Sequence, residues 1–286
     1  MAVKLELVKE LRDKTGAGFL DCKEALASNA GNIDSAIDYL RKKGLAKASK
    51  KSSREANEGA VGFFENNDLC ILIKVNSETD FAAKGETFLD FIDYLGTNIL
   101  DLNNLNLDLE SALNTKISSK TIKEHVDEMI AKIGENIVIS DLRIFDRKDS
   151  HLSFYVHNPY RKNIGKIISI LKYSVKIDNE KTQMFAKNVC MHIAALKPEA
   201  IDENTLDEKI ISKELNIQKE LISSSGKPEN VIEKILEGKM KKFYSEITLL
   251  NQNFVMDPDK TVKHIISSDL KDYDFELKMF DYITLT

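Results

Sequence analysis

Side chains that could catalyse a reaction or bind a metal ion are few and widely spaced in this sequence of 286 residues. The closest two of its five histidines, His151 and His157, lack the i, i+4 spacing that places two imidazoles on one helical face for zinc. No GxxxxGK phosphate loop, GxSxG nucleophile elbow or GxGxxG dinucleotide motif occurs in the sequence. We therefore expect no enzymatic activity, no cofactor and no direct nucleotide binding, with an active site assembled from distant residues as the remaining alternative.

The three cysteines, Cys22, Cys70 and Cys190, show no spacing that indicates chemistry. They are isolated, odd in number and set among apolar neighbours, and no CxxC pair is present for redox chemistry or zinc binding. This usage is typical of reduced, buried thiols in a cytoplasmic protein.

The segment VNSETDFAAK at residues 75–84 indicates recognition of a partner rather than catalysis. It follows Leu69–Val75, seven residues with one charge, which predict a mostly buried strand. Short polar side chains that favour a turn and the start of a helix come next: Asn76, Ser77, Thr79 and Asp80. Phe81 is therefore expected in or just before the first turn of a helix, at the end of a rigid strand.

Two interpretations of Phe81 are open at this point. Phe81 is in helical phase with an apolar stripe, and could simply extend its core face: Phe88, Phe91, Ile92, Leu95 and Ile99. Against this, Lys84 and Gly85 interrupt the stripe, and the glycine favours a helix break. In the second interpretation, Phe81 is an exposed anchor for a partner.

The same string, VNSETDFAAK, resembles a signature of the elongation factor Ts family, the bacterial exchange factors for the translation GTPase elongation factor Tu. Further motifs match that family in the expected order, over roughly residues 5 to 265: TGAGFLDCKEAL, KIGENI, SGKP, KMKKF and NFVMDPDKTV. Two positions depart from its pattern, since Ala82 stands where a bulkier aliphatic residue is common and Gly85 where Asn or Asp is usual.

The resemblance implies a partner, elongation factor Tu, and a set of contact residues. A magnesium-displacement motif is implied at Thr79, Asp80, Phe81 and Ala82, where Phe81 would wedge in near the magnesium site of the GTPase and Asp80 would hold the turn or bond to the partner. The other implied partner-binding residues are Phe19, Leu20, Lys23, Ile133, Gly134, His157, Val255 and Met256.

Three apolar stripes at helical spacing predict a bundle over residues 1–44. The first ends at a TGAG turn, the second near Gly31 and the third at Gly44. The resemblance implies a ubiquitin-associated-like domain. Phe19 and Leu20 are adjacent, so they cannot both face inward, and we expect one of them to be exposed. Seven basic residues and no acidic one between Arg41 and Arg54 indicate a linker at residues 45–58.

The centre of the chain predicts two related units, each a β-hairpin followed by a helix. The first, residues 59–145, has a turn at 66–68 and a last strand from Asn136 to Phe145. The second, residues 146–205, has a turn around Asn158-Pro159 and a helix to Leu196. Strands followed by helices on one side predict an α+β fold with antiparallel sheets.

The remaining chain predicts a helical hairpin and a return to the second unit. Residues 206–243 form two helical arms around the turn at 223–228, with one apolar face made by Ile210, Ile217 and Leu221. Residues 244–286 end in a strand and complete the C-terminal subdomain. Glu214 interrupts the apolar seam, so we expect a free monomer that forms a one-to-one complex.

Composition limits the class of protein further. With 41 basic and 46 acidic residues the formal net charge is −5, which argues against a general nucleic-acid binder. No apolar run approaches a membrane span, and the N-terminus lacks the apolar region of a signal peptide. We expect a cytoplasmic bacterial protein. Three hypotheses remain: a nucleotide exchange factor, an interaction scaffold using the N-terminal bundle, and an RNA-associated factor using the basic linker.

Overall fold

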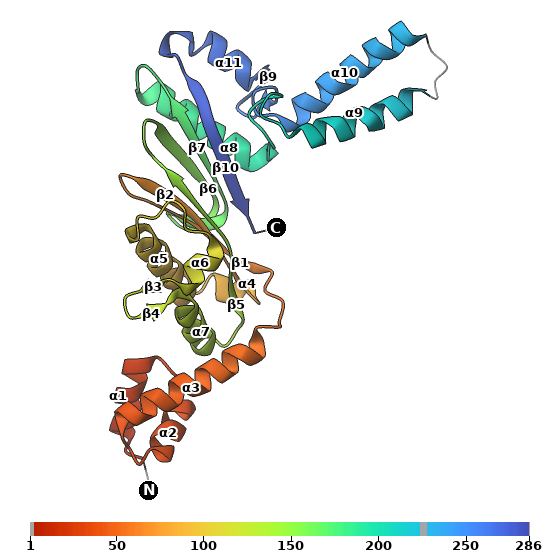
Figure 1. Cartoon of the computed structure of the whole chain (residues 1–286). Coiled ribbons are helices and arrows are strands. Elements are labelled where there is room, and N and C mark those ends of the chain that lie inside the picture. The colour runs from red at the N-terminus through yellow and green to blue at the C-terminus, as the bar shows by residue number, and fades with distance from the viewer. Residues whose placement is uncertain (1–2, 224–227, 286) are drawn as a thin grey trace. The chain divides into compact units, whose positions relative to one another are not determined.

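The computed structural model describes residues 3–223 and 228–285 (Figure 1). The chain divides into two compact units. The first contains residues 1–146, 158–167 and 283–286, and the second contains residues 147–157 and 168–282. Most of the turn expected at residues 223–228 lies outside the described residues.

The N-terminal bundle of the first unit consists of three helices, as predicted: α1 (Leu5–Thr15), α2 (Phe19–Ser28) and α3 (Ile33–Lys51). Gly16, at a φ of 67°, ends α1 in the left-handed conformation. The side chain of Asn32 caps α3 by accepting a hydrogen bond of 2.9 Å from the backbone N–H of Ser35. The core is made by Val8, Leu11, Cys22, Ala25, Leu26 and Ala36.

The predicted end of the third helix at Gly44 is wrong, because α3 continues to Lys51 and includes much of the expected linker. Gly44 allows two helices to approach closely and does not end α3. A Cβ atom at this position would lie 3.0 Å from the Cβ of Ala131 in α7 (Ile122–Ile133). Ala48 is buried in the main core of the unit. The second half of α3 is therefore a packed element and not a solvated tether.

The sheet of the first unit is built on β1 (Glu58–Glu65), β2 (Leu69–Ser77) and β5 (Ile137–Asp146), which pair antiparallel in that order. The start of β7 (Ile164–Ser174) pairs with β1, with Gly165 opposite Val61. All residues of β2 except Lys74 are buried, as the apolar run predicts. The predicted strand from Asn136 to Phe145 is confirmed by β5.

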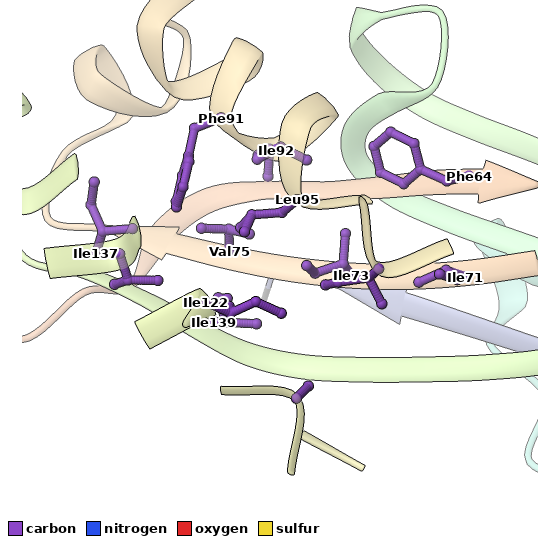
Figure 2. Packing of buried hydrophobic residues seen from close by; sticks show 14 of the residues in the cluster. Phe64, Ile71, Ile73, Val75, Phe91, Ile92, Leu95, Ile122, Ile137 and Ile139 are labelled. Atoms are coloured by element: carbon purple, nitrogen blue, oxygen red, sulfur yellow. The ribbon is translucent and has the colours of Figure 1, made fainter. Parts of the chain in front are cut away.

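Helix α5 (Glu86–Asp101) covers this sheet with the predicted apolar stripe. In Figure 2 its residues Phe91, Ile92 and Leu95 lie against Ile73 and Val75 of β2. Between α5 and α7 the chain forms a short helix and a small ladder: α6 (Leu109–Asn114), β3 (Lys116–Ile117) and β4 (Lys120–Thr121). The core of the first unit thus lies between one sheet face and the helices that follow its strands.

The second unit packs α8 (Glu180–Leu196) with strands β7, β6 (His151–Arg161) and β10 (Glu276–Thr284), where β7 pairs with both other strands. The ring of Phe275 stacks on Tyr173 at 4.8 Å between centroids and meets Phe185 edge-on at 5.1 Å. The smaller elements are β8 (Asn253–Phe254), β9 (Asp257–Thr261), α11 (Val262–Ser268) and the 3-10 helix η1 (Lys271–Tyr273).

The predicted turn at Asn158-Pro159 is wrong, because β6 runs through it and the chain reverses after Arg161. Asn158 takes a φ of 48°, yet the residues on both sides of it belong to the same strand. Arg161 is then held by three carboxylates on successive turns of α5, those of Glu86, Asp90 and Asp93. This long-range ion-pair network explains why local turn residues did not locate the reversal.

The helical hairpin is confirmed, with arms α9 (Glu208–Ser223) and α10 (Glu229–Ile247) side by side (Figure 1). The apolar face that we assigned to the first arm is shifted. Ile217 and Leu221 are 41% and 65% exposed, whereas Ile222 and Met240 are buried. The seam thus passes through Ile222, one residue after the predicted Leu221. No helix in the described part of the chain is long and apolar enough to cross a membrane.

Candidate functional site

Phe81 projects from α4 (Asp80–Ala83), a single helical turn after β2, and its side chain is 88% exposed. Ala82 and Ala83 on the same turn are buried against the core. Gly85 is the N-cap of α5, so α4 and α5 are separate helices and Phe81 loses its phase with Phe88. The interpretation of Phe81 as an extension of the core stripe is therefore wrong, and the interpretation as an exposed side chain is confirmed.

Thr79 and Asp80 stabilise the turn that carries Phe81. Thr79 is the N-cap of α4, and its side-chain oxygen accepts a hydrogen bond of 3.2 Å from the backbone N–H of Ala82. Asp80 forms an ion pair of 2.8 Å with Lys84, one turn further on. The hydrogen bond from Lys84 lowers the pKa of the Asp80 carboxyl from its ordinary value, so this side chain is ionised at neutral pH.

Ile133 and Gly134 form the end of α7, next to the α4 turn. Gly134 has a φ of 87° and ends the helix, and Ile133 is half-buried against the core. The following residue, Glu135, accepts hydrogen bonds from both the backbone N–H and the hydroxyl of Thr79. The structure thus brings the Ile133–Gly134 turn and the Thr79–Ala82 segment together.

Phe19, Leu20 and Lys23 lie at the start of α2, and all three are exposed. The side chain of Leu20 is 77% exposed and that of Phe19 is 42% exposed, while Cys22 beside them is buried in the bundle. The expectation that one of the two apolar residues faces outward is confirmed, and in fact both do.

Val255 and Met256 form the turn between β8 and β9 in the second unit, where the side chain of Met256 is 46% exposed. His157 lies on β6, half-buried, with its Nδ1 3.2 Å from the hydroxyl of Tyr155. Val255, Met256 and His157 all lie in the second unit.

His192, which the sequence did not mark as a candidate, lies next to Val255 in the second unit. It is fully buried on α8, its Nε2 lies 2.9 Å from the side-chain oxygen of Gln252, and its Nδ1 accepts a hydrogen bond of 3.3 Å from the N–H of Val255. Burial lowers the pKa of its imidazole below the ordinary value, so the ring is neutral at pH 7. The signal available in the sequence was a histidine inside the apolar stripe of α8.

Part of the basic run that suggested an RNA contact is paired within the protein. Arg41 contacts Glu124 at 2.7 Å, Lys43 contacts Glu24 at 2.6 Å, and the ammonium of Lys51 donates to the carbonyl of Gly134. These contacts use part of the positive charge of α3 within the protein itself.

A cavity of about 640 Å³ lies between the N-terminal bundle and helices α5 and α7. His125 of α7 is in its wall, with Nε2 3.2 Å from both the hydroxyl of Tyr94 in α5 and the carbonyl of Ile117. The imidazole is thus engaged in contacts that join α7 to its neighbours. Within the described ranges, no three His, Cys, Asp or Glu side chains are grouped so as to hold a metal ion. Cys22, Cys70 and Cys190 are buried free thiols, as predicted.

Together these features define an α+β protein with exposed apolar side chains at Phe81 on the α4 turn and at Leu20 near the start of α2. The chain matches the family described as Elongation factor TS over residues 78–285. It is 39% identical to elongation factor Ts of Rickettsia felis over 279 residues, which is 96% of this chain and 89% of that protein. It is also 39% identical to elongation factor Ts of Ehrlichia ruminantium over 285 residues, or 99% of this chain and 98% of that protein. The chain therefore belongs to the elongation factor Ts family of translation elongation factors.

Proposed function

We propose that the protein is a guanine-nucleotide exchange factor that binds elongation factor Tu with GDP and promotes GDP release by displacing magnesium. Membership of the elongation factor Ts family supports this role in translation. The observation that carries the proposal is the position of Phe81, a large apolar side chain 88% exposed on a turn whose next residues, Ala82 and Ala83, are buried. An aromatic residue that is absent from its own core is available to fill a pocket in a partner.

Such a factor needs no catalytic group, because exchange follows from reciprocal coupling between two binding events. Whatever favours the nucleotide-free GTPase weakens nucleotide binding by the same factor. Phe81 would enter the GTPase near its magnesium site and stabilise a conformation in which the magnesium contacts are lost. The ionised Asp80, fixed by Lys84, would hold the turn or accept a hydrogen bond from the partner.

The other exposed residues would extend the contact with the GTPase. Phe19, Leu20 and Lys23 would meet its nucleotide-binding domain, and Val255 and Met256 would support the same side. Ile133, Gly134 and His157 would meet a domain further from the nucleotide. Apolar side chains such as Leu20, 77% exposed, support this assignment because most of their surface is not packed against the protein itself.

The test is the rate of GDP release from elongation factor Tu, measured by stopped flow with a fluorescent GDP. We expect Phe81→Ala to slow release by about 30-fold or more, because truncation of an interface hot spot costs about 2 kcal/mol or more. The unfolding temperature should change little, since Phe81 makes no core contact. Leu105→Ala is the control, an apolar residue of the same unit that is 45% exposed outside the motif. Unchanged release with Phe81→Ala would contradict the proposal.

A further inference from the structure

Where the β2–β5 ladder ends, two glutamates on neighbouring turns each accept a hydrogen bond from the backbone of the other turn. The last residues paired in this ladder are Ser77 and Ile137. Beyond them Glu78 accepts a hydrogen bond of 2.6 Å from the backbone N–H of Asn136. In the opposite direction, Glu135 accepts a hydrogen bond of 3.0 Å from the backbone N–H of Thr79. Each turn therefore supplies a carboxylate to the backbone of the other, and the two side chains continue the ladder past its last backbone pair.

We call these two crossed hydrogen bonds, accepted by Glu78 and Glu135, the brace. The hydroxyl of Thr79 connects the brace to α4. It donates a hydrogen bond of 2.7 Å to Glu135 and accepts one of 3.2 Å from the N–H of Ala82. A hydroxyl has one proton, so its donation to Glu135 leaves the oxygen lone pairs free to face Ala82. Glu135 thus sets the orientation in which Thr79 caps the helix, and charge on the acceptor strengthens the bond.

The direction of Phe81 is set by the backbone of its turn, which the Thr79 cap holds together with the buried Ala82 and Ala83. Helix α4 has four residues, far fewer than a helix needs for stability of its own. The side chain of Phe81 is 88% exposed, so packing within the protein does not restrain it. The backbone of the turn, fixed at Thr79, is what directs the ring.

The second carboxylate of the brace, that of Glu78, is itself held in the ionised state. The hydrogen bond from the Asn136 N–H lowers the pKa of Glu78 below its ordinary value. Arg54 adds a contact of 3.4 Å to Glu78, and its carbonyl accepts a hydrogen bond of 2.7 Å from the side chain of Asn136. The segment after α3 therefore supports the brace from a third side.

We propose that Glu135 is a positioning residue for nucleotide exchange: through Thr79 it fixes the direction of Phe81 and joins that anchor to the Ile133–Gly134 turn. The proposal rests on the exchange function proposed above. An anchor held in its bound direction loses less freedom on binding, so the brace acts by preorganisation. Glu135 itself would not touch the nucleotide or its magnesium.

The first test compares Glu135→Gln with Glu124→Gln in the full-length protein. Glu124 is a matched control, because it accepts hydrogen bonds from the N–H and the hydroxyl of Thr121 at the other end of α7. In Glu135→Gln the amide group keeps a single acceptor oxygen and loses the charge. We expect it to slow GDP release from elongation factor Tu about tenfold at saturating factor, the size of effect typical of one charge-assisted hydrogen bond. Glu124→Gln should stay within about twofold of the unmodified protein.

A substitution of Thr79 tests the route from Glu135 to Phe81. Thr79→Val removes the hydroxyl that bonds to Glu135 and to the Ala82 N–H, and it should match Glu135→Gln. Both changes break the same chain of hydrogen bonds, from Glu135 through the Thr79 hydroxyl to Ala82. The GDP release rate with the double variant Thr79→Val/Glu135→Gln should therefore be within about twofold of the rate with Thr79→Val alone. Independent, multiplicative losses would overturn the proposal. Thr79→Val also keeps it testable if Glu135→Gln fails to fold.

Amide hydrogen exchange in the free protein supplies a measurement that does not depend on activity. Glu135→Gln should lower the protection of the Thr79 and Ala82 amides, and Glu124→Gln should leave it unchanged. Unaltered protection in Glu135→Gln would overturn the brace. If the unmodified protein fails to accelerate GDP release, the proposed function falls and the positioning role falls with it. If the unmodified protein accelerates GDP release and Glu135→Gln accelerates it equally, the proposed function stands and only the positioning role is wrong.

Discussion

Phe81 and Phe88 are identical side chains seven positions apart, and one is 88% exposed while the other is fully buried. The difference comes from Gly85, where the chain leaves one helix and begins the next. If a single helix spanned both residues, burial of Phe81 would contribute roughly 1.5 to 3 kcal/mol to folding. The protein forgoes that contribution, which leaves the ring available for a partner at the end of a rigid strand.

His192 gives a prediction about pH at the same scale. Its pKa is lowered by burial, so below about pH 6.5 the unfolded chain takes up a proton that the folded protein excludes. The contribution of the neutral His192 imidazole to the free energy of unfolding is thus fully present above pH 6.5 and is lost as the pH falls below that value. The slope is at most about 1.4 kcal/mol per pH unit. Protonation would also convert the Nδ1 acceptor for the Val255 N–H into a donor, which would loosen the turn that carries Met256.

The measurement is urea unfolding of the unmodified protein and His192→Gln between pH 7.5 and 5, monitored in the second unit. We expect His192→Gln to be less stable at pH 7.5 and to lose less stability on acidification. His264→Gln, at an exposed histidine on α11, is the control and should keep the unmodified slope. Equal slopes for His192→Gln and the unmodified protein would show that this imidazole does not govern the acid dependence.

At the scale of elements, the contact between α3 and α7 depends on a glycine inside a helix. A Cβ atom at Gly44 would be 3.0 Å from Ala131, closer than an ordinary van der Waals contact. We expect Gly44→Leu to destabilise the protein by about 1 to 3 kcal/mol, because the larger side chain must push the helices apart. Thermal unfolding followed by circular dichroism measures the loss.

Gly238 in α10 provides the matched control for this substitution. It is also inside a helix, but a Cβ atom there would have no neighbour within 4 Å. Leucine is the better helix former by roughly 0.5 to 1 kcal/mol, so Gly238→Leu should leave stability unchanged or raise it slightly. Equal changes in stability for both glycines would mean that close packing against Ala131 does not explain Gly44.

The elements that sequence predicted correctly are those set by local periodicity. The apolar run of β2 and the stripe of α5 determine their own burial, because neighbours within each segment already define one face. Gly44 and Asn158-Pro159 misled the prediction because their roles depend on distant contacts, with Ala131 in one case and with the carboxylates around Arg161 in the other. Composition of a short window does not contain that information.

The candidate site shows the same division. The turn at Thr79 and Asp80 could be predicted, since their side chains cap locally. The exposure of Phe81 remained open until the helix break was seen at Gly85. Glu135 and His192 were missed because each acts on a backbone group 56 and 63 residues away in sequence. Side chains that position a site from another element require the tertiary structure.

At the scale of the whole molecule, the helical hairpin raises the question of self-association. Its arms bury Ile222 and Met240, so part of the apolar seam is satisfied within one chain. Glu214, half-buried in the first arm, accepts a hydrogen bond of 2.7 Å from Gln218 and interrupts the apolar surface. The outward residues Ile217, Leu221 and Val231 are 41%, 65% and 38% exposed. Single exposed apolar residues of this kind are common on monomeric proteins.

We therefore expect a monomer in solution that forms a one-to-one complex with elongation factor Tu. Multi-angle light scattering of the free protein and of the complex, over a range of concentrations, measures both masses. The hairpin offers a specific check, because Leu221→Glu places a charge on the most exposed of the outward residues and leaves the buried Ile222 in place. A dimer that persists at nanomolar concentration and dissociates with Leu221→Glu would show that the hairpin is an oligomerisation element, because burial of a charge in an apolar contact is strongly unfavourable. A monomeric mass for the unmodified protein and for Leu221→Glu at all concentrations is the expected result, since Ile222 and Met240 are already buried within each chain.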